Sequence, residues 1–158
     1  MLTTPQEVNG RGAFNLVQGF IKALPTATTP ATFINLVTGG AWGVYPFMSG
    51  YAISKLVSLQ LGTYVATAYP NITTISIHPG LVQTDMHDPA FAKFNRDTPE
   101  LVGGTIVWLA SEKAKFLTGR TVCANWSVDD LVERKDEILA ENLLVMNLKG
   151  KFGKEQFE

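Results

Sequence analysis

The sequence of 158 residues contains very little cysteine and few charged side chains. Cys123 is the only cysteine, which excludes a disulfide within the chain and fits a reducing compartment. Charged residues make up 17%, and their formal net charge is −1. A chain with this balance has no basic field to attract a phosphate backbone or anionic lipid. We therefore expect no nucleic acid partner and no membrane partner.

We also expect no segment that directs the chain into or across a membrane. Residues 1–7 contain no basic region followed by an apolar stretch, so they do not resemble a secretory signal. No apolar run approaches the roughly 20 residues that span a bilayer. These features lead us to expect a cytoplasmic protein. The two histidines, His78 and His87, do not cluster with other ligand-type residues, so we also expect no metal site.

The chain does have enough hydrophobic residues, 46%, to bury one core. We expect a single domain over residues 1–148 and a flexible tail over residues 149–158. Apolar periodicity and turn residues predict helices that alternate with short strands, the pattern of a parallel sheet covered by helices. The expected helices span residues 5–24, 49–69 and 98–111 and a charged segment from 127, and the expected strands span 33–37, 72–77 and 121–125. Residues 81–97 show no period and are expected to form a mobile loop or lid.

Tyr51 and Lys55 are the first candidates for chemistry. They lie four positions apart at the start of an expected helix, so their side chains share one face. A nearby ammonium group favours the phenolate and lowers the pKa of a tyrosine from its usual value of about 10. Tyr51 can then exchange a proton with a substrate oxygen. On an arbitrary helix the same pair is usually just solvated, so its meaning depends on the motifs around it.

Those surrounding motifs occur in a characteristic order. They are Asn9 on the first helix, Thr38 after the first strand, Tyr51-x-x-x-Lys55 on the next helix, and Pro79-Gly80 with Thr84 after the next strand. In this order the chain resembles the short-chain dehydrogenase/reductase family. Residues 117–126, which begin Leu-Thr-Gly-Arg, look like the end of a fungal-type member.

The resemblance implies a role for each candidate catalytic residue. Thr38 stands thirteen positions before Tyr51, where the family has a serine, and would hydrogen-bond the substrate carbonyl. Tyr51 would be the general acid/base, and Lys55 would hold the nicotinamide ribose while lowering the tyrosine pKa. Asn9 would complete the family's proton relay.

The resemblance also implies a nicotinamide cofactor, NAD or NADP. Residues 79–84 are similar to the family's proline-glycine loop, where a glycine lets the backbone approach the nicotinamide. Without the resemblance, Pro-Gly would simply indicate a turn. The cofactor-binding residues implied are Tyr51, Lys55, Pro79, Gly80, Val82 and Thr84.

The implied fold is α/β, a partial doubly wound, Rossmann-like parallel sheet with three remaining strands and flanking helices. The family's N-terminal βαβ units, whose glycine-rich turn binds the pyrophosphate, are missing from this sequence. Residues 37–43 follow a strand and contain Thr-Gly-x-x-x-Gly, but Tyr45 stands at the third glycine position and Pro46 interrupts the expected helix. We therefore interpret this segment as the carrier of Thr38 and not as a phosphate loop.

Three functions follow as hypotheses. The first is an NAD(P)-dependent oxidoreductase acting on a carbonyl or alcohol, present as a truncated chain. The second is a truncated pseudoenzyme or dimerisation module that associates with itself or with a full-length relative through helices 5–24 and 49–69, relieving an unpaired strand edge. The third is a cofactor-independent isomerase, cyclase or dehydratase that reuses the Tyr-Lys pair.

Overall fold

The computed structural model describes residues 4–85, 93–94, 96–148 and 153. Its centre is a sheet of three parallel strands in the order β1 (Ala31–Leu36), β2 (Ile72–His78) and β3 (Thr121–Cys123). Ala31 lies opposite Ile72 at one end of the sheet. All three expected strands are therefore present, and their parallel pairing confirms the expected α/β arrangement.

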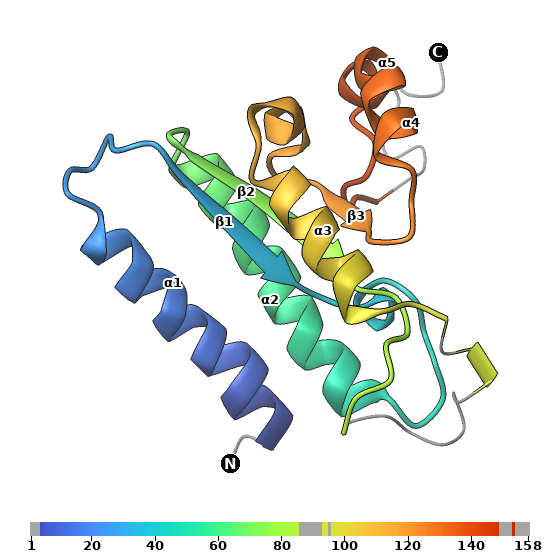
Figure 1. Ribbon diagram of the computed structural model, residues 1–158. Coiled ribbons are helices and arrows are strands. Elements are labelled where there is room, and N and C mark those ends of the chain that lie inside the picture. Colours follow the sequence, from blue (N-terminus) through green and yellow to red (C-terminus); the bar gives the residue numbers. More distant parts are fainter. Residues whose placement is uncertain (1–3, 86–92, 95, 149–152, 154–158) are drawn as a thin grey trace.

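The first helix and α2 (Ser49–Ala68) cover one face of the sheet. The first helix is continuous and consists of a π-helical turn, η1 (Gln6–Arg11), followed by α1 (Gly12–Ala23). Figure 1 shows α1 and α2 side by side, with β1 and β2 lying across α2. Buried side chains of Val17, Val65 and Ile72 form the core between them.

The opposite face of the sheet carries α3 (Pro99–Leu109) and the larger core cluster. Ile75 and Ile77 of β2 are fully buried there, which reflects the alternation of side chains along a strand. α3 begins where expected, because the Thr98 side chain accepts a hydrogen bond from the Leu101 N–H at 3.2 Å. β2 thus contributes to two core clusters, with Ile72 packed against α1 and α2 and with Ile75 and Ile77 packed on the α3 side.

The C-terminal helical region differs from the sequence prediction. The charged segment from residue 127 forms two short helices, α4 (Val128–Glu133) and α5 (Lys135–Ala140), which separate at Arg134. Ser127 caps α4 by accepting from the Asp130 N–H at 3.2 Å. A short 3₁₀ helix between α3 and β3, η4 (Glu112–Leu117), was not expected, because its six residues are too few to show a helical period.

Several peripheral features bear on the sequence predictions. β1 pairs on one side only within the described part of the chain, so its other edge is open. The expected loop over residues 81–97 begins and ends with an isolated bridge between Val82 and Asp97, while residues 86–92 and 95 lie outside the described residues. The predicted tail, apart from Gly153, also lies outside them. Within the described ranges no helix is long and apolar enough to cross a membrane.

Candidate functional site

The site is built around the carboxyl end of β1. Val37 continues the pairing beyond the strand, since its N–H donates to the Ile77 carbonyl at 2.9 Å. Thr38 then adopts an extended conformation, and its hydroxyl accepts from the Gly40 N–H at 3.3 Å. This bond turns the chain into a three-residue 3₁₀ helix, η2 (Gly39–Ala41). Because η2 ends at once, no long helix begins here, and the segment lacks the helix N-terminus that a phosphate loop needs.

Tyr51 and Lys55 lie on the first turns of α2, next to this strand end. The Lys55 ammonium donates to the carbonyl of Leu36, the last residue of β1, at 3.1 Å. The Tyr51 phenol lies close enough to the Thr38 side chain for Thr38 to lower its pKa. The structure therefore brings three of the four predicted catalytic residues together.

The pKa values of the pair move toward the neutral forms. Burial raises the pKa of Tyr51 above 10.0, and the hydrogen bond from Thr38 lowers it by less. Burial lowers the pKa of the Lys55 ammonium below 10.5. The expected lowering of the Tyr51 pKa by Lys55 is thus wrong for this chain, because burial of the phenol dominates the shift and the cause that lowers the pKa is Thr38.

Asn9 lies in the π-helical turn and contacts α2 through two serines. Its side-chain amide donates to the Ser54 hydroxyl at 3.1 Å, and its carbonyl accepts from the Ser58 hydroxyl at 2.6 Å. Ser54 in turn donates to the Tyr51 carbonyl at 2.7 Å. Asn9 is therefore connected to the backbone of the candidate tyrosine. Sequence reasoning missed both serines, although their spacing of four on an apolar helix places them on one face.

The predicted cofactor loop after β2 is held by a residue that the sequence analysis did not single out. Gly80 has a φ of +79°, a conformation that favours glycine, and a Cβ there would overlap the carboxylate of Asp97. That carboxylate accepts from the Leu81 N–H at 2.7 Å. Val82 packs against the main core, whereas Thr84 is exposed. The Leu81 N–H in this loop is therefore already bonded to an oxygen, that of the Asp97 carboxylate.

His78 and Cys123 lie at the ends of β2 and β3, opposite each other in the sheet. Burial lowers the pKa of His78, and the negative charge of Asp97 raises it by less. Burial also raises the pKa of the Cys123 thiol, with a further increase from Asp97. His78 packs edge-on against the Trp42 ring with 5.9 Å between centroids. Among the described residues no group of acidic, histidine and cysteine side chains could hold a metal.

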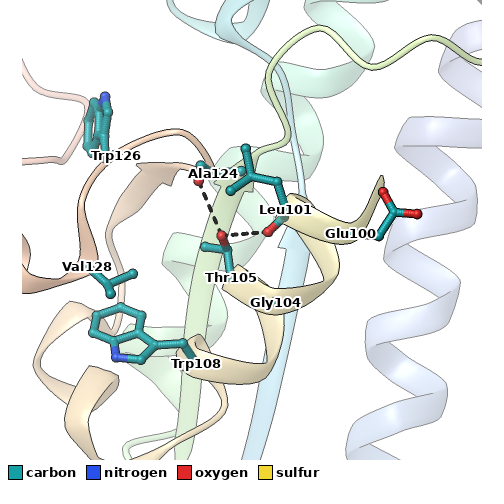
Figure 2. A pocket seen from close by; sticks show the side chains of 8 residues that line it. All are labelled: Glu100, Leu101, Gly104, Thr105, Trp108, Ala124, Trp126 and Val128. Atoms are coloured by element: carbon teal, nitrogen blue, oxygen red, sulfur yellow. Dashed lines mark hydrogen bonds between the residues drawn. The ribbon is translucent and has the colours of Figure 1, made fainter. Parts of the chain in front are cut away.

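A separate hollow of about 410 Å³ lies on the far side of the sheet, between α3 and the segment that follows β3. Figure 2 shows Thr105 between α3 and the segment after β3, where its hydroxyl bonds the carbonyls of Leu101 and Ala124 at 2.9 and 3.2 Å. The residues that line it are Glu100, Leu101, Gly104, Thr105, Trp108, Ala124, Trp126 and Val128. None of the predicted site residues is among them, so this hollow is distinct from the Tyr51 site.

Comparison with known proteins identifies what the chain is similar to. A family model described as enoyl-(acyl carrier protein) reductase matches residues 2–126. The short chain dehydrogenases mpl6 of Monascus purpureus and citE of Monascus ruber are each 35% identical over 147 residues, covering 90% of this chain and 50% of the relative. The short chain dehydrogenase andI of Emericella variicolor is 30% identical over 148 residues. The chain spans about half the length of the curated relatives it matches.

Solved structures give the same result for the fold. A gluconate 5-dehydrogenase from Burkholderia cenocepacia, solved in complex with NADP and tartrate, matches with a TM-score of 0.67 at 20% identity. The match covers 75% of this chain and 52% of that one. A short-chain dehydrogenase/reductase from Serratia marcescens matches with a TM-score of 0.63 at 25% identity over the same shares. These likenesses confirm the partial Rossmann-like fold.

Proposed function

The chain belongs to the short-chain dehydrogenase/reductase family of oxidoreductases, and from this premise we propose that it carries the proton-transfer site of an NAD(P)-dependent oxidoreductase acting on a carbonyl or alcohol. The observation that carries the proposal is the convergence of Thr38, Tyr51 and Lys55 at the end of β1. A hydroxyl, a phenol and an ammonium then lie in one small volume, which is what proton exchange with a substrate oxygen requires.

Each of these groups has a chemical task in the proposal. The Tyr51 phenol has an ordinary pKa well above neutral, and burial raises that pKa further, so it carries a proton that it can donate to a developing alkoxide during carbonyl reduction. The Thr38 hydroxyl, close to the phenol, orients the same substrate oxygen. The Lys55 ammonium bonds the Leu36 carbonyl at the end of β1, and its remaining N–H donors are available to a ribose.

The residues of this chain that fit a nicotinamide cofactor are those that would bind its nicotinamide and the attached ribose. Tyr51, Lys55 and the loop residues Pro79, Gly80, Val82 and Thr84 would hold that end, and the bound nicotinamide would supply or accept the hydride. Support comes from the loop after β2, where the Leu81 N–H binds a carboxylate oxygen of Asp97 beside Gly80, so this backbone can bind an oxygen acceptor. The described residues contain no glycine-rich turn followed by a helix for the pyrophosphate.

Fluorescence titration with NADH and with NADPH tests this function. We expect quenching that saturates and that is weakened when Lys55 is replaced in Lys55→Met, because the ribose contact is lost. The matched control is Lys22→Met, since Lys22 is exposed on α1, away from the site. Absence of saturable binding by the unaltered chain would overturn the proposal. Turnover of a substrate without any nicotinamide would favour an isomerase, cyclase or dehydratase instead.

A second proposal, association through helices 5–24 and 49–69, is favoured by their exposed apolar side chains. Leu16 on α1 is 64% exposed and Tyr64 on α2 is 72% exposed. Val8, Phe14, Ile53 and Val57 on the same helices are also exposed. Such a surface favours a second copy or a longer relative. Sedimentation tests this: dimers that dissociate in Leu16→Glu would support it, and monomers at all concentrations would overturn it.

A further inference from the structure

We propose that Ser58 is a positioning residue for the Tyr51 site, because it bonds the middle of α2 to both η1 and β1. The inference rests on the proposed function of Tyr51, but it concerns where that side chain is held. The Ser58 side chain lies in the interior, with the residue 4% exposed, and it takes no direct part in the site described above. Its hydroxyl and its backbone carbonyl each bond a different element, η1 and β1.

The hydroxyl of Ser58 provides the link to η1. It donates to the Asn9 carbonyl at 2.6 Å, the shortest bond between the first helix and α2. The side-chain amide of the same Asn9 donates to the Ser54 hydroxyl on α2, and that hydroxyl donates to the Tyr51 backbone carbonyl. π-Helical turns inside helices frequently occur at functional sites, and this one presents Asn9 to α2 through both its backbone and its side chain.

The carbonyl of Ser58 provides the link to the sheet. It accepts from the Asn35 amide at 2.8 Å, and the same amide lies 3.4 Å from the Ser76 hydroxyl on β2. Gly62 packs beside this contact, where a Cβ would lie 3.5 Å from the Asn35 nitrogen and a tight 3.3 Å from the Ser76 hydroxyl. Asn35 directly precedes Leu36, which binds Lys55. Two successive residues of β1 therefore hold successive turns of α2.

This arrangement determines the distance between Tyr51 and Thr38. Tyr51 belongs to α2, whereas Thr38 follows β1 by two residues, so the proximity of their side chains depends on how α2 packs on β1 and η1. Loss of the Ser58 hydroxyl removes one of the three side-chain bonds between η1 and α2 and leaves the Asn9 backbone carbonyl without this partner. We expect the phenol to become more accessible to water, which lowers its pKa toward the usual value.

Nitration with tetranitromethane at pH 8 measures this effect, because the reagent attacks the phenolate. Tyr64, an exposed tyrosine on the same helix, serves as an internal reference. In Ser58→Ala we expect the rate at Tyr51 relative to Tyr64, read by peptide mass spectrometry, to rise about threefold or more, equivalent to about half a pKa unit. The matched control is Thr67→Val, which removes an exposed hydroxyl bonded only to the Thr63 carbonyl within α2.

The outcomes separate positioning from general stability. A Ser58→Ala chain that is less stable but nitrates Tyr51 at the unaltered ratio would overturn the proposal, since a merely structural serine has that effect. If Ser58→Ala does not fold, Ser58→Cys keeps the volume and weakens the donor, and the same rise at Tyr51 is expected. The measurement needs no cofactor, so its result stands apart from the nucleotide titration that tests the proposed function.

Discussion

The carboxylate of Asp97 accepts a hydrogen bond from the backbone N–H of Leu81 at 2.7 Å, although the two residues lie sixteen positions apart. The same carboxylate fills the space beside Gly80, where a side chain is absent, and the Asp97 backbone pairs with Val82. Asp97 therefore joins the start of the loop after β2 to the residues that lead into α3. The predicted cofactor loop owes its shape to this contact.

Replacing Asp97 by alanine should destabilise the chain. A hydrogen bond to a charged acceptor contributes more than a neutral one, and at this half-buried position we expect a loss of about 1 kcal/mol. Urea unfolding measures it. Asp85→Ala is the control, because Asp85 is an exposed carboxylate in the same loop. An Asp97→Ala chain as stable as Asp85→Ala would contradict this prediction.

Gly80→Ala should be more damaging than Asp97→Ala. The left-handed backbone at φ +79° costs about 1–2 kcal/mol for a residue with a Cβ. The new methyl group also overlaps the Asp97 carboxylate. The two effects can be separated by introducing Gly80→Ala into the Asp97→Ala chain, where the overlap with the carboxylate is gone and the added loss is mainly the backbone cost of the alanine. Additive losses in the double-mutant cycle would show that the overlap is absent.

The elements and the core of the site were predictable from local sequence patterns. Strands β1 and β2 are short β-branched runs bounded by proline, asparagine and glycine, so their limits lie within about two residues of expectation. The expectation that Thr38 and Tyr51 act on the same substrate came from the resemblance to the family, which the spacing of thirteen residues between them supports. The order of the motifs identified the family correctly.

Contacts made at long range were not predictable in the same way. Asp97 lies in a loop without periodicity, and nothing in its neighbours indicates that it returns to Leu81. Ser58 and Asn9 are 49 positions apart, and their bond depends on the packing of η1 on α2. The direction of the Tyr51 pKa shift also required the structure, since burial is a tertiary property. Spacing alone indicated only the nearby ammonium.

His78 should make stability depend on pH in the weakly acidic range. Burial holds its folded-state pKa below 6.5, so in that range the unfolded chain binds more protons. Stability is therefore expected to rise with pH through the window just below about 6.5 and to level off above it. Urea unfolding at a series of pH values measures the slope, and His78→Asn should reduce it. An unchanged slope would mean that other groups cause it.

Cys123 should react slowly with thiol reagents at neutral pH. Burial and the charge of Asp97 both raise the pKa of its thiol above 9.0, so the reactive thiolate is scarce. We expect the rate with a disulfide reagent to be well below that of the same chain unfolded in urea. Asp97→Asn removes one of the two causes and should increase the rate modestly. A folded rate equal to the unfolded rate would contradict the assignment.

Tyr51→Phe should abolish most of the proposed catalysis while leaving the fold intact. The variant removes the phenolic proton but keeps the ring, so carbonyl reduction with NADPH or NADH should fall by about 10²–10⁴-fold. Tyr64→Phe, a matched change at an exposed position of the same helix, should have no effect. Activity of Tyr51→Phe within about threefold of the unaltered chain would remove Tyr51 from the proton-transfer role.

The pH profile of that activity provides an independent check on the Tyr51 proton. Reduction needs the protonated phenol, and a pKa raised above 10.0 keeps the proton in place through the neutral and weakly alkaline range. The rate should therefore stay level to about pH 9 and decline only above the usual tyrosine value. A decline centred near neutrality would contradict the prediction that burial keeps the Tyr51 pKa high. Substitution of Thr38 by valine removes the bond that lowers the pKa and should move any alkaline decline to still higher pH.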